Sequence, residues 1–259
     1  MGILNVTPDS FSDGGAFFDS ARAIAHAQEM RDQGADILDI GAESTRPYGD
    51  AVEVSADEEL RRLRPVLRPV VALGIPVSID TMKAAVAHAA LAAGASMVND
   101  VWGLQRDPDM ARVVADHAVP VIVMHNRVAA DPAIDIMNDI IAFFSRSIEI
   151  AARAGITPDR IVLDPGIGFG KTPQQSVEAL ARFAELKSFR LPLLIGASRK
   201  RFIDSVSPAP PSQRLGGSIA AHLIAAENGA NILRVHDVAQ TVQALRVANA
   251  IRTASKGNT

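Results

Sequence analysis

Two aspartates stand directly after short apolar runs, where their carboxylates could bind a ligand. Asp80 follows the run at 77–79, and Asp164 follows the run at 161–163. A carboxylate at the end of a buried strand is costly to desolvate, so it needs hydrogen-bond donors. Each aspartate could accept N–H bonds from a heterocycle whose edge resembles guanidine, or it could cap the following helix. Taken singly, capping is favoured, but two such aspartates with Asn99 between them in strand order favour a binding site.

A glycine-rich stretch at 164–172 imitates a nucleotide-binding loop. It ends in Gly170-Lys171-Thr172, but Pro165 stands where a phosphate-binding loop requires its first glycine. The dinucleotide fingerprint fails as well, because Lys171 occupies the position of its third glycine. We therefore expect the alternating glycines to let the backbone pass close to a flat ligand, with Phe169 as a wall.

Cationic side chains follow the last two apolar runs. Arg234 and His236 alternate in a strand-like segment, so both should leave the same face and could clamp a phosphate. Alternatively, Arg234 pairs with Asp237 or a neighbouring carboxylate and braces the fold. Asp237 is also expected to cap the last helix. Lys200 could pair with an anion or donate to a carbonyl oxygen, or it could belong to a solvated basic loop.

The elements that must position these residues form a repeated pattern. Short apolar runs at 2–4, 37–40, 75–79, 96–98, 121–124, 161–163, 193–195 and 232–235 alternate with helical stretches. Glycines at 34, 94 and 229 are placed to end helices in the left-handed conformation. Ser55 and Glu58 form a capping-box pattern, and Pro65 and Pro69 should kink the helix that follows.

This pattern predicts an α/β fold, a TIM (β/α)₈ barrel that spans residues 1–259 as a single domain. The rival is a doubly wound open sheet, which has the same local pattern. A polar residue ends nearly every apolar run: Asn5, Asp80, Asn99, His125, Asp164, Ser198 and Arg234. In a barrel these groups would meet at one mouth, whereas an open sheet would string them along an edge. The barrel is therefore the favoured fold.

The composition excludes several function classes. The net charge of -3 gives no support to nucleic-acid binding, and the absence of cysteine excludes disulfides, thiolate metal sites and cysteine nucleophiles. No apolar run is long enough to span a membrane, and no signal-peptide pattern opens the chain. We expect a cytoplasmic protein.

The ordered motifs resemble those of dihydropteroate synthases. Residues 1–15 match the N-terminal signature of this family almost letter for letter, and residues 39–47 look like its second signature. Shorter matches follow in the family's order at 78–81, 98–100, 123–125, 164–171, 198–200 and 234–237. The resemblance covers essentially the whole chain and implies a pterin-binding TIM barrel.

The resemblance also implies a reaction and a set of site residues. The family is a group of transferases that condense 6-hydroxymethyl-7,8-dihydropterin pyrophosphate with p-aminobenzoate in folate biosynthesis, and it is a target of sulfonamides. By this resemblance, the pterin would contact Asp80, Asn99, Met124, Asp164, Phe169, Gly196 and Lys200. The pyrophosphate would contact Asn5, Arg234 and His236, with Mg²⁺ near Asn5, and p-aminobenzoate would contact Phe11, Thr45, Arg46, Pro47 and Ser198. The catalytic groups would be Asp80, Lys200 and Arg234. The resemblance also implies a homodimer.

Two departures from the family and two alternative functions stay open. Tyr48 stands where the family commonly has glycine, and the stretch at 126–130 lacks the glycine-containing segment often found there. A methyltetrahydrofolate-dependent methyltransferase barrel would also bind a pterin, but it would not need the sets at 198–200 and 234–236 for pyrophosphate. A pterin-binding protein without catalysis would have no use for a clamp on a leaving group.

Overall fold

The computed structural model describes residues 1–6, 16–43 and 54–256. The strands within these residues are β1 (Gly2–Asn5), β2 (Leu38–Gly41), β3 (Val77–Asp80), β4 (Met97–Asp100), β5 (Val121–Met124), β6 (Ile161–Asp164), β7 (Leu194–Ile195) and β8 (Ile232–Leu233). The α-helices are α1 (Ala16–Asp32), α2 (Ala56–Val71), α3 (Ala84–Ala92), α4 (Met110–His117), α5 (Ile136–Ala154), α6 (Pro173–Ala181), α7 (Arg201–Val206), α8 (Leu215–Glu227) and α9 (Val238–Lys256). Short 3₁₀ segments are η2 (Pro158–Arg160), η3 (Phe183–Phe189) and η4 (Pro211–Gln213).

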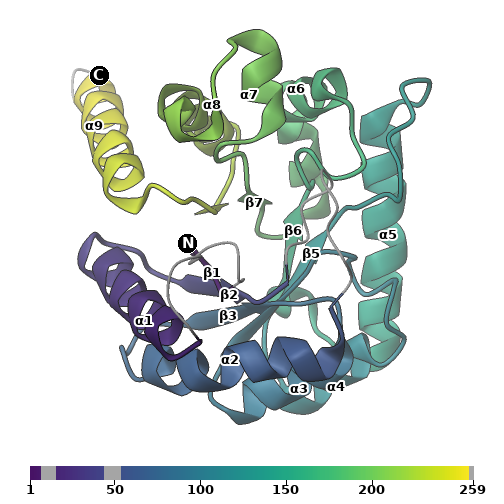
Figure 1. The fold of residues 1–259 in the computed structure, drawn as a ribbon. Coiled ribbons are helices and arrows are strands. Elements are labelled where there is room, and N and C mark those ends of the chain that lie inside the picture. The colour runs from purple at the N-terminus through teal and green to yellow at the C-terminus, as the bar shows by residue number, and fades with distance from the viewer. Residues whose placement is uncertain (7–15, 44–53, 257–259) are drawn as a thin grey trace.

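The strands close into a ring. Strands β1 to β6 pair in parallel and in chain order, and β7 pairs with β8. Isolated parallel bridges join the two groups at both ends: Leu163 to Leu193, and Gly2 to Val235. Figure 1 shows the helices surrounding the strands, from α1 round to α9. The predicted TIM barrel is confirmed, and the open sheet is excluded because an open sheet has no bridge between its first and last strands.

The helix-to-strand joints follow the sequence pattern. Gly34, Gly94 and Gly229 have φ of 98°, 108° and 107°, the left-handed conformation expected after a helix. The capping box at the start of α2 forms only in part. Ser55 accepts the Glu58 N–H at 3.2 Å, whereas the Glu58 carboxylate accepts from Arg61 and Arg62. Helix α2 continues through Pro65 and Pro69, which lie on its exposed side.

Two apolar layers support the polar ends of the strands. The main core lies between strands and helices. A second cluster is drawn from strands β4 to β8 and from the residue before β1. It consists of Ile122, Val162 and Leu194 with the partly buried Met1, Met97 and Ile232. Because side chains alternate across a strand, we place this cluster inside the barrel, below the polar strand ends. No helix in the described residues is long and apolar enough to cross a membrane.

Candidate active site

Arg234 is the central cation of the barrel mouth. Its Nε donates to Asp39 Oδ2 at 2.6 Å, and its Nη2 donates to Asp80 Oδ2 at 2.7 Å. The interaction joins β2, the end of β3 and the residue that follows β8, and Asp39 is completely buried. Arg234 therefore does brace the barrel, but not through Asp237. The side chain of Asp237 instead accepts from Arg199 Nε at 3.0 Å. The backbone carbonyl of Asp237 accepts the N–H of Thr241 in the first turn of α9, as expected of the residue that precedes this helix.

Next to this ion pair lie buried oxygen atoms without a donor. Asn99 Nδ2 donates to Asp39 Oδ2 at 3.0 Å. The remaining oxygens, Asp39 Oδ1, Asp80 Oδ1 and Asn99 Oδ1, accept no hydrogen bond from any described residue. Burial raises the pKa of Asp80 to about 7, although the charge of Arg234 opposes the shift. Buried polar groups without a partner are expensive, so this arrangement favours a ligand that brings N–H donors.

Asp164 and Lys200 are two further residues with charged side chains at the barrel mouth. Asp164 Oδ1 accepts the Gly166 N–H at 2.8 Å, and burial raises the pKa of its carboxyl. Lys200 Nζ donates to the Ile167 carbonyl and lies 4.1 Å from the centre of the Phe169 ring. Burial lowers the pKa of Lys200 to about 7, with the charge of Asp164 opposing the shift.

Met124 and Gly196 complete the predicted pterin set. Met124 ends β5 in register with Asp164 on β6. A Cβ added to Gly196 would lie 3.9 Å from both Arg234 Cβ and Asp164 Oδ2, so this glycine borders both charged groups. The structure thus brings the predicted pterin residues to neighbouring strand ends at the same mouth.

The helix-capping interpretation of the two aspartates is wrong. The N-cap position of α3 is occupied by Lys83, and α6 begins with a capping box between Thr172 and Gln175. The carboxylates of Asp80 and Asp164 are therefore not used at helix ends, and their role in binding a ligand stays a prediction.

Ser198, from the predicted p-aminobenzoate set, contacts His236, from the predicted pyrophosphate set. Its Oγ lies 3.0 Å from His236 Nδ1 and accepts the backbone N–H of His236 at 3.3 Å. Asn5 ends β1, opposite Gly41. Phe11, Thr45, Arg46 and Pro47, together with Tyr48, lie outside the described residues.

Two of the alternating glycines lie directly against another part of the chain. Gly166, Gly168 and Gly170 all have positive φ, as a chain of tight turns requires. A Cβ on Gly166 would lie 2.0 Å from the carbonyl oxygen of His125, and one on Gly170 would lie 2.4 Å from Arg127 Cβ. At these two positions glycine is needed for the close approach to the chain after β5. The passage of the backbone close to a flat ligand stays a prediction.

Sequence reasoning assigned no role to Asp39. The signal was present, since Asp39 is a charged residue within an apolar run. Its partner could not be identified from the sequence, because Arg234 is 195 residues away. Sequence reasoning also missed the buried hydrogen-bond network around Lys171.

The chain is similar to proteins of known family along nearly its full length. A family model described as "Pterin binding enzyme" matches residues 1–236. Dihydropteroate synthase of Bacillus subtilis is 44% identical over 252 residues, which cover 97% of this chain and 87% of that protein. A dihydropteroate synthase from Clostridium difficile, crystallised in the presence of pteroic acid, is 50% identical with a TM-score of 0.93 and covers 97% of this chain and 95% of its own. The Xanthomonas albilineans enzyme with 4-aminobenzoic acid is 47% identical, with a TM-score of 0.93 and coverage of 97% and 92%.

The lowered pKa of Lys200 predicts a pH dependence of stability. Between pH 7 and the ordinary value of 10.5, the unfolded chain binds more protons at Lys200 than the folded protein does. The contribution of Lys200 to the free energy of unfolding therefore rises with pH in this window, and its cost is fully present below about pH 7. We expect Lys200→Met to gain most stability relative to the parent protein at pH 6.5, with the gain shrinking towards pH 10. Urea unfolding of the variant and the parent protein between pH 6.5 and pH 10 measures this difference in stability. The exposed Lys187→Met is the control. A gain in stability that does not change with pH would contradict the prediction.

Proposed function

The chain belongs to the pterin-binding enzymes, and within them to the dihydropteroate synthases, and we propose that its barrel mouth carries out the condensation typical of that family. The reaction joins 6-hydroxymethyl-7,8-dihydropterin pyrophosphate to p-aminobenzoate and gives 7,8-dihydropteroate and pyrophosphate. The chain is thus a transferase of folate biosynthesis.

The observation that carries this proposal is the set of buried acceptors without donors. Asp80 Oδ1 and Asn99 Oδ1 are buried and accept no hydrogen bond from the described residues, and Asp164 is a further buried acceptor at the end of β6. The amino-pyrimidinone edge of a pterin presents several N–H donors in one plane, which suits such acceptors. Phe169 and Met124 supply apolar surface for the ring, and Lys200 supplies a donor for its carbonyl oxygen.

The cations suit the leaving group. Arg234 uses one N–H of Nε and one of Nη2 for Asp39 and Asp80, so its guanidinium keeps further donors for an anion. His236 lies two residues after Arg234 in the chain and contacts Ser198. Preorganised cationic donors stabilise negative charge that develops as a bond breaks. Arg234, His236 and Lys200 would therefore favour departure of the pyrophosphate from the exocyclic methylene carbon.

The bond to p-aminobenzoate forms at the same carbon. As the C–O bond to pyrophosphate breaks, the arylamine nitrogen donates its lone pair to the methylene carbon. The secondary ammonium group formed in this way then loses a proton to solvent and becomes the neutral secondary amine of the product. The Asp80 carboxylate would stabilise positive charge on the pterin during this step. Ser198 would contact p-aminobenzoate. No covalent bond to the protein is required.

Mg²⁺ is proposed as the cofactor of this reaction. Among residues 1–6, 16–43 and 54–256, no three His, Cys, Asp or Glu side chains lie close enough together to hold a metal ion. The described residues could therefore hold Mg²⁺ only together with ligands from the substrate. Such sites are common, because Mg²⁺ often binds phosphates with few protein ligands. Asn5 would supply an amide oxygen beside the pyrophosphate. The bound ion would add positive charge that favours the leaving group.

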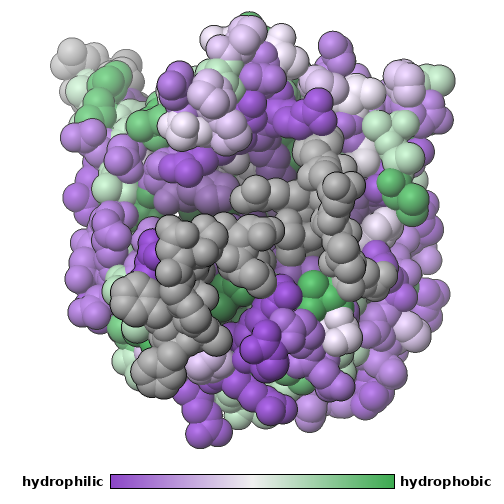
Figure 2. Space-filling model, viewed as in Figure 1, coloured by the Kyte–Doolittle hydropathy of each residue, from purple (hydrophilic) through white to green (hydrophobic). Residues whose placement is uncertain are grey.

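A cytoplasmic homodimer is the proposed form of the protein. Exposed apolar side chains support the dimer: Val206 on α7, Ile224 on α8, and Val247 and Ile251 on α9 are between 51% and 72% exposed. Figure 2 shows hydrophobic groups over the region of α9, at the upper left, on a surface that is otherwise largely hydrophilic. Such groups would be better covered by a second copy than by water.

Pyrophosphate release tests the proposed reaction. Mixed with the pterin pyrophosphate, p-aminobenzoate and Mg²⁺, the protein should release pyrophosphate and form dihydropteroate in equal amounts. Omission of p-aminobenzoate should stop dihydropteroate formation. Binding of the pterin without any release would indicate a pterin-binding protein, and methyl transfer from methyltetrahydrofolate would indicate the methyltransferase alternative.

Asp164→Asn should weaken binding of the pterin ring. The asparagine can keep the hydrogen bond from the Gly166 N–H, but it replaces the charged oxygen Oδ2 by a donor. Losing a hydrogen bond between a charged and a neutral group costs about 1.5–3 kcal/mol, so the dissociation constant should rise by about tenfold to a hundredfold. Calorimetry with the pterin pyrophosphate measures it, with the exposed Asp159→Asn as matched control. Unchanged affinity in the folded Asp164 variant contradicts the assignment.

A further inference from the structure

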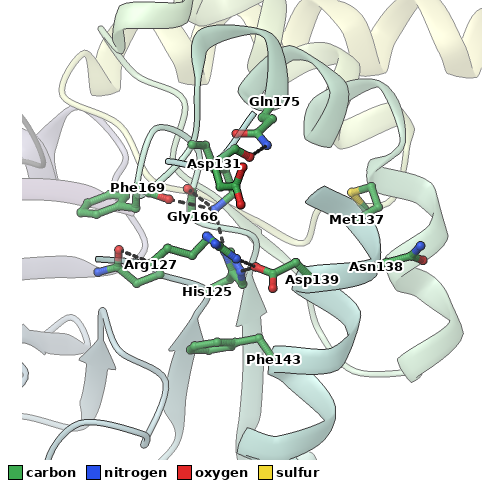
Figure 3. Close-up of polar contacts among 12 residues, drawn as sticks. His125, Arg127, Asp131, Met137, Asn138, Asp139, Phe143, Gly166, Phe169 and Gln175 are labelled. Atoms are coloured by element: carbon green, nitrogen blue, oxygen red, sulfur yellow. Dashed lines mark hydrogen bonds and ion pairs between the residues drawn. The ribbon is translucent and has the colours of Figure 1, made fainter. Parts of the chain in front are cut away.

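Lys171 is a buried lysine whose amino group contacts only the protein. It is 3% exposed. Burial lowers its pKa well below the ordinary value, although the charges of Asp164 and Asp139 oppose the shift. Lys171 Nζ lies 2.7 Å from His125 Nδ1 and donates to the carbonyl oxygens of Gly166 at 2.9 Å and Phe169 at 3.1 Å. Figure 3 shows His125, Gly166 and Phe169 converging at this point. These acceptors together engage every N–H of an ammonium group, so Lys171 has no donor left for a substrate.

The network fixes the tautomer of His125. The Asp139 carboxylate can only accept, so the ring proton lies on the nitrogen that faces it, and His125 Nδ1 accepts from Lys171. The proton of the ring is then on Nε2, which lies 2.9 Å from Asp139 Oδ2 and donates to it. Burial and the charge of Lys171 lower the pKa of His125 to about 3, so the ring is neutral. The ring of Phe143 packs edge-on against the His125 ring, with 4.9 Å between the ring centres, and keeps it in place.

The same network reaches the stretch at 126–130, which departs from the family pattern. Arg127 Nη1 donates to Asp139 Oδ2 at 2.8 Å, so this carboxylate accepts from both His125 and Arg127. The backbone of Arg127 lies directly against Gly170, where a Cβ would come within 2.6 Å of the Arg127 carbonyl oxygen. The chain after β5 and the loop after β6 are thus joined by an ion pair and by close packing.

The loop that encloses Lys171 carries the proposed pterin contacts. The Gly166 carbonyl accepts from Lys171, while the Gly166 N–H donates to Asp164 Oδ1. The Phe169 carbonyl also accepts from Lys171, while its ring faces the ammonium group of Lys200. Both the carboxylate and the aromatic wall are therefore attached to residues that Lys171 holds from inside the loop.

We propose that Lys171, oriented through His125 and Asp139, is a positioning residue that sets the distance between Asp164 and Phe169 and so the shape of the pterin slot. This inference rests on the function proposed above. Lys171 acts through the loop and does not touch the substrate. If it were only a structural cation, its loss would lower stability and affect both substrates alike.

The test is a comparison of the two substrates in Lys171→Met. We expect the dissociation constant and the KM of the pterin pyrophosphate to rise by about tenfold to a hundredfold, as for the loss of charged hydrogen bonds. The KM of p-aminobenzoate, measured at saturating pterin, should change by less than about threefold, well below the effect of a lost charged hydrogen bond. Lys187→Met removes an exposed lysine and is the matched control. Equal losses for both substrates, or unchanged pterin affinity in a folded variant, would overturn the proposal.

A cavity variant gives a second readout. Lys171→Ala removes the part of the side chain that propylammonium can replace. Propylammonium chloride should restore pterin affinity in this variant, whereas sodium chloride at the same concentration should not. Equal effects of the two salts in a folded variant would overturn the proposal.

Asp139→Asn covers the case in which the Lys171 variants do not fold. The asparagine oxygen can still accept from His125 Nε2, so the shape is kept and only the charge is lost. Pterin affinity should fall selectively, and no change in a folded variant would overturn the proposal. All comparisons are made against the parent protein. A parent protein without pyrophosphate release refutes the proposed function itself, while an active parent with unaffected variants refutes only the role of Lys171.

Discussion

The ion pairs of Arg234 with Asp39 and Asp80 are the interaction on which the rest of the site depends. A closed parallel barrel directs the ends of its strands into one mouth, and here that mouth receives three buried carboxylates, at Asp39, Asp80 and Asp164. Carboxylates held this close in a protein interior repel one another and lose hydration, so they need a cation among them. Arg234 supplies it, and its position follows from closure of β8 onto β1.

This arrangement keeps polar atoms ready for a ligand at a cost in stability. Burial raises the pKa of Asp80 and lowers that of Lys200, both to about 7, which shows that each charged form is disfavoured in the mouth. The unpartnered oxygens of Asp80 and Asn99 add to this cost. The apolar cluster inside the barrel and the core beneath the helices offset it. A site with disfavoured charges and unpartnered oxygens is typical of proteins that gain their missing hydrogen bonds from a ligand.

Much of the fold could be predicted from the sequence, because it depends on local patterns. The apolar runs, the glycines after helices and the polar residues at strand ends each follow from a few neighbouring residues. The site could be predicted only as a collection of candidates. The partners of Arg234 and Lys171 lie far away in the chain, so the roles of Asp39 and His125 depend on strand register and on the path of the loop after β6. For the same reason, the contacts of the glycines at 166 and 170 with the backbone at 125–127 could not be predicted from the sequence.

A crystal structure with a bound pterin pyrophosphate analogue tests the central claim most directly. The account holds that the mouth is a set of acceptors and cations arranged for a flat, N–H-rich ring with an anionic tail. It predicts that the N–H edge of the ring donates to Asp80 Oδ1, Asn99 Oδ1 and Asp164, with the ring beside Phe169 and the anion on Arg234 and His236. A ring bound outside the barrel mouth, or one that leaves these oxygens without donors, would contradict it.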